Sequence, residues 1–388
     1  MIEQFIYDIR TRILFGFGQL AHLHEEKLPG KKALLVISAG NSMKSQGYLA
    51  RVEKELALAG AGCVLFDQIK PNPTLDSVNE GAALAKREGC DFVVGLGGGS
   101  SMDAAKAIAF AMTNPGDLWD YCHSATGGKK APVADAAPVV CITTTAGTGS
   151  EVDQWAVVTK EATDEKTGFG YASMYPVLSV VDPDLMMTVP PKLTAFQGMD
   201  AFFHAAESVI NTKNHVMGEM FALKAIELIA HYLPRAVRDG SDREARYHMA
   251  VANTLAGYYM LCTSQHTIEH ALSGYYHDLP HGAGLIMISR AYFGKFAELH
   301  ACDGQMLKMA RAMGVEQPAD PGDFLRALDR LLHDSGVGEL KMSDYGVTME
   351  ALEKIPQRTR EVLGGDISAD PAELSDADIL EIMRQSFK

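Results

Sequence analysis

The sequence has 388 residues, 47% of them hydrophobic and 22% charged, which is enough to build two domains with separate cores. Its formal net charge of −14 argues against a nucleic acid or an anionic membrane as partner, because both attract surfaces rich in Lys and Arg. The six cysteines form no CxxC pair, and neither a signal peptide nor an apolar run of about 18 residues is visible, so we expect a cytoplasmic protein with reduced thiols.

Short apolar runs alternate with helix-period segments through the first half of the chain. The predicted strands cover residues 33–38, 63–67, 91–98, 138–145 and 177–183. This alternation is typical of a parallel sheet covered by helices. Beyond residue 189 strands disappear and long helix-period segments follow. We therefore predict an α/β domain over residues 1–189 and an all-helical domain over residues 190–388.

A glycine-rich turn joins the third predicted strand to its helix. Gly97, Gly98 and Gly99 let backbone N–H groups approach a phosphate, and a helix beginning at Ser101 would add the positive end of its dipole. The spacing G-x-G-G-G-S departs from the dinucleotide fingerprint G-x-G-x-x-G, so a tight turn without a ligand stays an alternative.

A second polar turn, TTTAGTGSEV at residues 143–152, follows the next predicted strand. Parallel strands end at the same edge of their sheet, where open α/β sheets bind ligands. Taken alone, a threonine cluster more often caps a turn. Two such loops together favour one extended ligand, such as a dinucleotide.

Histidine and aspartate recur at helical spacing in the second half. Asp200 and His204 are four residues apart, so their side chains project from one helix face, and His266 and His270 repeat that spacing. His281 follows in an LPHG turn. One carboxylate and three neutral imidazoles suit a divalent metal such as iron or zinc. A single histidine is more often an ordinary polar residue, but the joint pattern favours a metal centre.

Four segments resemble the signatures of the iron-dependent (group III) alcohol dehydrogenase family: GGGSSMDAAK, TTAGTGSEV, GMDAFFHA and HTIEHALSGYYHDLPHG. They occur in the order found in that family. The resemblance implies a dinucleotide-binding α/β domain followed by an all-helical, metal-binding catalytic domain, the architecture shared with dehydroquinate synthase. It also implies a homodimer and favours Fe²⁺ over Zn²⁺.

The same resemblance implies roles for single residues. The positions that match the family's metal ligands are Asp200, His204, His266 and His281, whereas His270 matches a non-ligand histidine beside the substrate. The positions that match its cofactor contacts are Asn72, Gly98, Gly99, Ser100, Asp103, Thr144, Thr145, Thr148 and Lys166. Asp153 stands where relatives often carry Thr.

The choice of nicotinamide cofactor depends on the end of the first predicted strand. NAD-selective sites place an acid there to bind the ribose 2′-hydroxyl, and none is present. Ser42 and Lys44 instead offer a hydroxyl and a cation, similar to relatives that accommodate a 2′-phosphate. We therefore expect NADP, with NAD as the alternative, because a missing acid also fits an unselective site.

The predicted reaction is hydride transfer between NAD(P)(H) and a small alcohol or aldehyde. A divalent cation would polarise the substrate oxygen, the nicotinamide would exchange hydride, and His270 would relay a proton. The alternative is a dehydroquinate-synthase-like lyase or cyclase, which would need Lys and Arg around the metal to hold a phosphorylated substrate. Residues 198–210 and 264–285 contain neither, so a dehydrogenase is preferred. A non-catalytic nucleotide-binding module leaves the Asp/His set without a purpose.

Overall fold

The structure is a computed structural model that describes residues 4–388, apart from the side chains of residues 363–366. Two compact units emerge from the contacts. One unit contains residues 8–145 and 149–187, and the other contains residues 188–388 together with residues 146–148 and 4–7. The division expected at residue 189 did not anticipate that these two short segments group with the helical unit.

The first unit is built on a six-stranded sheet in which all neighbouring strands are parallel. In sheet order the strands are β1 (Arg12–Phe15), β8 (Leu178–Val181), β5 (Val139–Thr143), β4 (Phe92–Gly97), β2 (Lys32–Ser38) and β3 (Gly62–Ile69). The chain runs outward from β2 to β3 and then returns to the other side of β2 with β4. The strand order therefore reverses between β2 and β4, the point at which doubly wound sheets bind their ligands.

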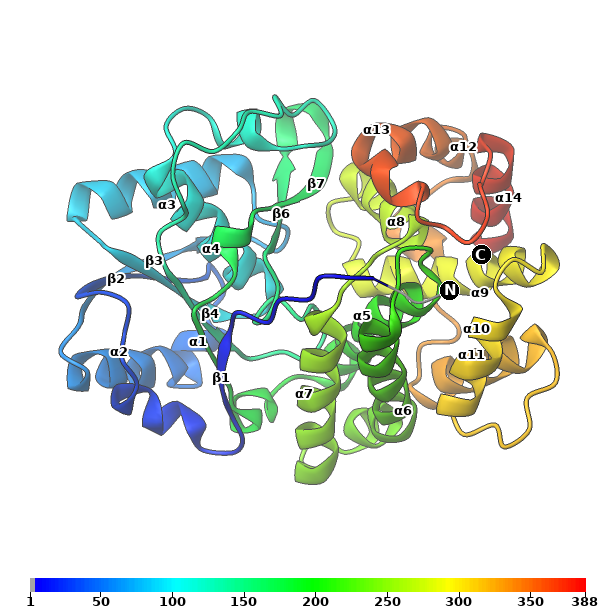
Figure 1. The fold of residues 1–388 in the computed structure, drawn as a ribbon, viewed down its shortest axis with the longest axis horizontal. Coiled ribbons are helices and arrows are strands. Elements are labelled where there is room, and N and C mark those ends of the chain that lie inside the picture. Colours follow the sequence, from blue (N-terminus) through cyan, green and yellow to red (C-terminus); the bar gives the residue numbers. More distant parts are fainter. Residues whose placement is uncertain (1–3) are drawn as a thin grey trace. The chain divides into compact units, whose positions relative to one another are not determined.

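Helices cover both faces of this sheet (Figure 1). Alternate residues of β2 enter different cores: Leu34 and Val36 pack with α3 (Leu75–Glu88) and α4 (Gly99–Thr113), whereas Leu35 packs with α2 (Tyr48–Leu58). Strands β4 and β5 are buried along their whole length. Burial on both faces explains why the sequence shows continuous apolar runs in these strands rather than alternation.

Two parts of this unit were not predicted from the sequence. Strand β1 has only four residues, RILF, and a single apolar run that short carries no clear period. Strands β6 (Trp155–Lys160) and β7 (Glu165–Gly170) form an antiparallel hairpin where only a polar stretch was expected. Asp164, with φ of 51°, occupies the left-handed region in the turn between them.

The second unit is helical, which confirms the predicted fold class. Its helices are α5 (Pro191–Ile210), α6 (Val216–Arg238), α7 (Arg243–Tyr258), α8 (Ser264–Tyr275), α9 (His281–Glu298), α10 (Asp303–Ala312), α11 (Pro321–Asp334), α12 (Met349–Leu352), α13 (Ile355–Ile367) and α14 (Asp376–Ser386). Helix α5 is buried on almost every side, since Phe202 and Phe203 pack into a core shared with Phe293 of α9. Among residues 4–388, no helix has both the length and the apolarity that crossing a bilayer requires.

Candidate metal centre and cofactor loops

The three predicted histidine ligands lie around the carboxylate of the fourth, Asp200. The Nε2 atoms of His204, His266 and His281 lie 3.8, 3.6 and 3.6 Å from Oδ1 of Asp200. Asp200 and His204 stand one turn apart on α5, His266 lies on α8, and His281 is the first residue of α9. Donor atoms at about 2.1 Å from a shared ion can be separated by at most about 4.2 Å, so each imidazole nitrogen is close enough to Oδ1 to share a cation with it. Asp200, His266 and His281 also offer donor atoms that all lie within 4.8 Å of one another, and His204 groups in the same way with Cys262 and His266.

Each of the three imidazoles is held through its other ring nitrogen. Nδ1 of His266 binds the Glu207 carboxylate and Nδ1 of His281 binds the Glu269 carboxylate, while Nδ1 of His204 lies 3.3 Å from the Gly147 carbonyl oxygen. Because Nδ1 binds these acceptors, Nε2 is the ring nitrogen that faces Asp200 and is left to bind a cation. A carboxylate or carbonyl behind each imidazole is the usual support of metal-binding histidines.

Two atoms of this centre are buried without a hydrogen-bond partner: Oδ1 of Asp200 and Nε2 of His266. Both residues are at most 4% exposed, so water does not compensate for the missing bonds. A buried polar atom left unpaired costs about 1–3 kcal/mol. Because the two atoms face the same point, a cation placed there would satisfy both, and the donor set fits a divalent metal.

The electrostatics of the centre favour a cation. Burial raises the pKa of Asp200, but the neighbouring imidazoles, His204 foremost, outweigh burial and hold that pKa well below its usual range. Burial lowers the pKa of His204 to about 4, so its imidazole is neutral near pH 7 and can act as a ligand. Burial also lowers the pKa of His266, but the negative charge of Cys262 and Glu207 outweighs it and raises that pKa well above the usual value.

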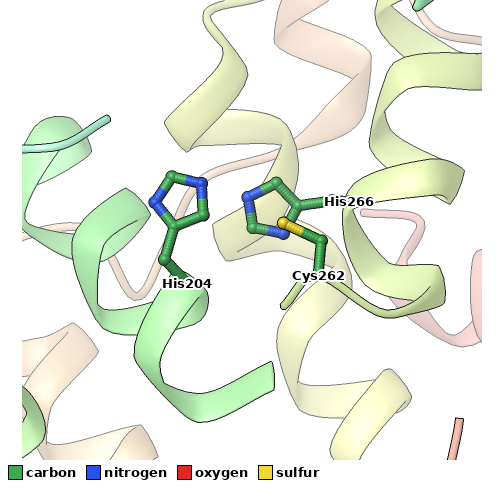
Figure 2. Close-up of side chains that lie close together, drawn as sticks. All are labelled: His204, Cys262 and His266. Atoms are coloured by element: carbon green, nitrogen blue, oxygen red, sulfur yellow. The ribbon is translucent and has the colours of Figure 1, made fainter. Parts of the chain in front are cut away.

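Cys262 stands beside the ligands, which the sequence analysis did not expect because the residue belongs to no CxxC pair. Its Sγ lies within 4.8 Å of ring nitrogens of His204 and His266 (Figure 2). The Nε2 atoms of the same two histidines lie 3.8 and 3.6 Å from Oδ1 of Asp200, so the sulfur and the carboxylate flank one pair of imidazoles. Asp200 and the three histidines stay the predicted ligand set, and Cys262 is a further possible donor beside His204 and His266.

His270 lies next to the ligand set rather than within it. It follows His266 by one turn of α8, is 6% exposed, and its ring centroid lies 5.2 Å from that of His281. It also groups with Glu269 and His281 as possible donors. Its predicted part in proton transfer stays a prediction.

The two predicted cofactor loops meet at the ends of β4 and β5. The Thr144 N–H donates to the Gly97 carbonyl at 2.9 Å, and a Cβ added to Gly98 would lie 3.0 Å from Cγ2 of Thr145. Gly97, with φ of 145°, adopts a backbone conformation that suits glycine. Helix α4 begins at Gly99, two residues earlier than predicted. The loop residues that lie together are Gly98, Gly99, Ser100, Thr144 and Thr145.

Asp103 braces these loops from within the protein. Its Oδ1 accepts a hydrogen bond from Oγ of Ser150 at 2.5 Å, and its Oδ2 accepts one from the Val157 N–H at 3.0 Å. Lys106, fully buried one turn later on α4, donates to Oδ1 of Asp153 at 2.8 Å. Burial raises the pKa of Asp153 to about 6. Asp153 is thus the counter-ion of Lys106, and direct contact between Asp103 and a pyrophosphate stays a prediction.

Lys44 is paired with an acid that the sequence analysis overlooked. Its Nζ lies 2.5 Å from Oδ2 of Asp67 on the neighbouring strand β3, and this hydrogen bond lowers the pKa of Asp67. Ser42 begins the short helix α1 (Ser42–Ser45) directly after β2. Both residues thus follow one of the two strands that flank the reversal of strand order.

The other predicted cofactor residues are dispersed. Asn72 has φ of 57°, a left-handed conformation in the loop between β3 and α3. Lys166 is buried within β7, and Thr148 belongs to the short segment that groups with the helical unit. Their contacts with a cofactor stay predictions.

Comparison with known proteins places this geometry in a family. Residues 10–183 match the model of the iron-containing alcohol dehydrogenases, and residues 194–387 match the C-terminal model of the Fe-containing alcohol dehydrogenase family. The choline dehydrogenase of Bacillus subtilis is 44% identical over 253 residues, a match that spans 65% of this chain and 62% of that protein.

Other matches extend over the whole chain. The 1,3-propanediol dehydrogenase of Citrobacter freundii is 33% identical, with 99% of both chains covered. The crystal structure of an archaeal halo-thermophilic alcohol dehydrogenase from a Red Sea brine pool superimposes with a TM-score of 0.94 at 36% identity and complete coverage of both chains. A dehydroquinate-synthase-like lyase is therefore not favoured. The chain belongs to the iron-containing alcohol dehydrogenase family.

Proposed function

We propose that the protein is a metal-dependent dehydrogenase that transfers hydride between a nicotinamide cofactor and a small alcohol or aldehyde. One observation carries the proposal: three imidazole nitrogens surround Oδ1 of Asp200, and each imidazole is backed by a hydrogen-bond acceptor. Such support is needed to hold a catalytic cation but serves no purpose in a module that only binds a nucleotide.

The protein's own residues have separate tasks in this proposal. Asp200, His204, His266 and His281 would hold the cation, which when bound supplies the positive charge that polarises the substrate oxygen. Glu207 and Glu269 fix the orientation of two of the imidazoles. His270, beside His281, would pass a proton between the substrate oxygen and water.

Iron is the proposed metal and zinc the alternative. Imidazole and carboxylate ligands accept both ions, and affinity for divalent metals follows the metal series and supply more than the ligand type. The names of the matching family models favour iron.

NADP(H) is the proposed cofactor and NAD(H) the alternative. Lys44 after β2 offers a cation for a 2′-phosphate, but the carboxylate of Asp67 already binds it. A 2′-phosphate would have to displace this carboxylate, whereas a ribose hydroxyl could donate to it. We therefore propose a modest preference for NADP(H) rather than strict selectivity.

The proposed assembly is a cytoplasmic homodimer. The six cysteines, all within the described part of the chain, form no disulfide, which suits a reducing compartment. Light scattering on the purified protein tests the assembly, since a mass near 42 kDa would reject the dimer.

The activity is tested with anaerobically prepared protein loaded with Fe²⁺ or Zn²⁺. Small primary alcohols and aldehydes are assayed with NADP(H) and NAD(H), and the His281→Ala variant serves as the control without a complete ligand set. The proposal expects metal-dependent turnover that the variant lacks. Equal turnover by the wild type and the variant would overturn it.

A further inference from the structure

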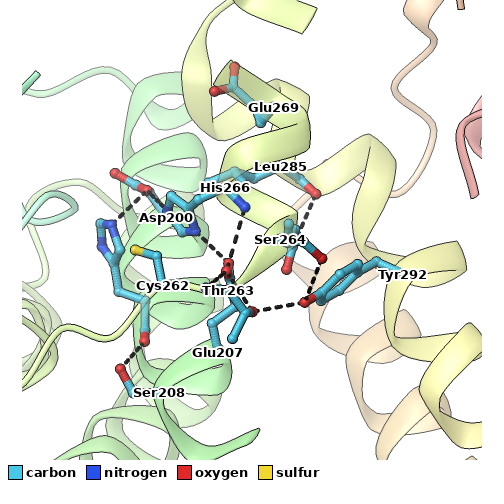
Figure 3. Close-up of polar contacts among 12 residues, drawn as sticks. Asp200, Glu207, Ser208, Cys262, Thr263, Ser264, His266, Glu269, Leu285 and Tyr292 are labelled. Carbon is cyan, nitrogen blue, oxygen red and sulfur yellow. Dashed lines mark hydrogen bonds and ion pairs between the residues drawn. The ribbon is translucent and has the colours of Figure 1, made fainter. Parts of the chain in front are cut away.

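A buried chain of hydrogen bonds leads away from the metal centre. It begins at Nδ1 of His266 and continues through the Glu207 carboxylate to Oγ1 of Thr263 at 2.9 Å. From there it reaches the hydroxyl of Tyr292 at 2.8 Å and Oδ1 of Asp370 at 3.1 Å. Each of these residues is at most 6% exposed. Figure 3 shows the first four, which come from α8, α5, the residue before α8, and α9.

The hydrogens along this chain can be counted. Four oxygen–oxygen contacts need one hydrogen each: Thr263 to Glu207, Thr263 to Tyr292, Ser264 to Tyr292 at 3.4 Å, and Tyr292 to Asp370. The three hydroxyl groups supply only three hydrogens, and burial keeps the pKa of Tyr292 well above its usual value, so its hydroxyl stays protonated. With Asp370 ionised, one contact would therefore bring two oxygen lone pairs together.

A proton on Asp370 supplies the missing hydrogen. Asp370 and Ser264 then donate to the Tyr292 hydroxyl, Tyr292 donates to Thr263, and Thr263 donates to Glu207. All four contacts become hydrogen bonds that run in one direction, toward the carboxylate that supports His266. Glu207 is the poorer site for this hydrogen, because its carboxylate already accepts from Nδ1 of His266 and from the Thr263 N–H at 2.7 Å. Asp370 accepts from the Ser264 N–H at 2.9 Å through Oδ1, and a protonated Oδ1 can accept that bond and still donate to Tyr292.

The second carboxylate oxygen of Asp370 supports the same conclusion. Oδ2 is buried and has no hydrogen-bond partner, which is costlier for a charged carboxylate than for a neutral acid. Glu207 from α5 and Tyr292 from α9 face Asp370. The Ser264 N–H, at the start of α8, donates to its Oδ1 at 2.9 Å. Burial, with the charge of Glu207, raises the pKa of Asp370 to about 7 against the hydrogen bonds from Ser264 and Tyr292.

We propose that Asp370 carries a proton in the folded protein and acts as a positioning residue, ordering the chain through Tyr292 and Thr263 that holds Glu207 against His266. The inference rests on the proposed function, because His266 is one of the proposed ligands. Ionisation of Asp370 removes the hydrogen from one link of the chain and loosens the support of His266.

The proton on Asp370 is tested in the metal-free, full-length protein. The Asp370→Asn variant removes the titrating carboxyl group. Because folding raises the pKa of Asp370, the wild type gains stability from this proton at low pH and loses it as pH rises to about 7. The folding constant of the variant relative to the wild type should therefore rise by up to about tenfold per pH unit across pH 5–7. Urea unfolding that gives a constant ratio would overturn the proposal.

The coupling to the metal centre is tested by Co²⁺ titration at pH 6.5. Tyr292→Phe should weaken Co²⁺ binding about tenfold, the size of effect seen when support of a ligand is lost. Asp370→Asn should weaken binding to a similar extent, because Oδ1 faces the Ser264 N–H as well as Tyr292, and an amide nitrogen in its place could not accept from Ser264. Tyr121→Phe is the matched control, since its buried hydroxyl donates to the Pro115 carbonyl in the other unit.

Different results would overturn the positioning role of Asp370 and the proposed function. If Tyr292→Phe binds Co²⁺ as tightly as Tyr121→Phe does, Asp370 and Tyr292 do not position the centre and the proposal is overturned. If the wild type binds no Co²⁺, the proposed function and the positioning role both fall, while the pH dependence of unfolding still decides whether Asp370 holds a proton.

Discussion

The carboxylate of Glu269 accepts a hydrogen bond from Nδ1 of His281, which lies twelve residues later in the chain. Glu269 is fully buried on α8, between His266 and His270, so one helix turn carries a proposed ligand together with the support of another. This pairing links the orientation of α9 to that of α8 at the point where the cation would bind.

Removal of the Glu269 charge should therefore weaken metal binding. In Glu269→Gln the amide oxygen can still accept from His281, but the imidazole loses the negative charge behind it and becomes a poorer ligand. We expect the affinity for Zn²⁺ to fall about tenfold or more in a competition titration with a chelator. Glu55→Gln is the control, because it alters a Glu–His pair, with His24, in the other unit. Equal affinities in the two variants would contradict the role of Glu269.

Metal uptake should release protons. The pKa of His266 is raised in the metal-free centre, so this imidazole holds a proton near pH 7 that the cation must displace. We expect about one proton per ion in weakly buffered solution, followed with an indicator dye, and an affinity that falls as pH decreases. Uptake without proton release at pH 7 would show that His266 is already neutral.

Cys262 should be dispensable for metal retention. Cys262→Ser leaves Asp200 and the three histidines unchanged, so the metal content per chain should match that of the wild type, whereas His266→Ala should lose the metal. Elemental analysis of the two purified variants decides the point. Loss of the metal in Cys262→Ser would place the sulfur among the ligands.

The pair of Lys44 and Asp67 should tune the preference between the two cofactors. Asp67→Asn frees the ammonium for a 2′-phosphate, so KM for NADPH should fall several-fold while KM for NADH changes little. Lys44→Ala should have the opposite effect on NADPH. Both side chains are partly exposed, so the differences should shrink at high salt. Unchanged kinetics in both variants would remove this pair from the cofactor site.

Lys106 should be essential for the stability of the first unit. Its ammonium is fully buried and bonded to Asp153, and Lys106→Met leaves that acid without its counter-ion. Breaking a buried pair from one side costs about 3–5 kcal/mol, which urea unfolding would detect. The double variant with Asp153→Asn should recover part of the loss. A single variant as stable as the wild type would show that the pair contributes nothing.

Features that depend on neighbours along the chain could be predicted from the sequence. The apolar runs of β2, β4 and β5 and the i,i+4 spacing of Asp200 with His204 depend on neighbours along the chain, and both predictions agree with the structure. The hairpin of β6 and β7 was missed because the apolar part of β6, WAVVTK, is short and β7, EKTGFG, is mostly polar residues and glycine.

The hydrogen-bond partners of the histidines and of Lys44 could not be predicted from the sequence. Glu207 lies three residues after His204 but supports His266, on another helix, so its spacing gave no hint of its partner. The Gly147 oxygen belongs to the backbone and leaves no trace in residue type. Asp67 was not predicted because it lies on β3, whereas Lys44 follows β2.

The central claim is that Asp200, His204, His266 and His281 hold one divalent cation. The most direct measurement is anomalous X-ray scattering from crystals of the protein grown with Co²⁺ or Zn²⁺. The account predicts a single strong peak within about 2.3 Å of Oδ1 of Asp200 and of all three Nε2 atoms. A peak bound by other residues, or none at this point in metal-saturated crystals, would contradict it.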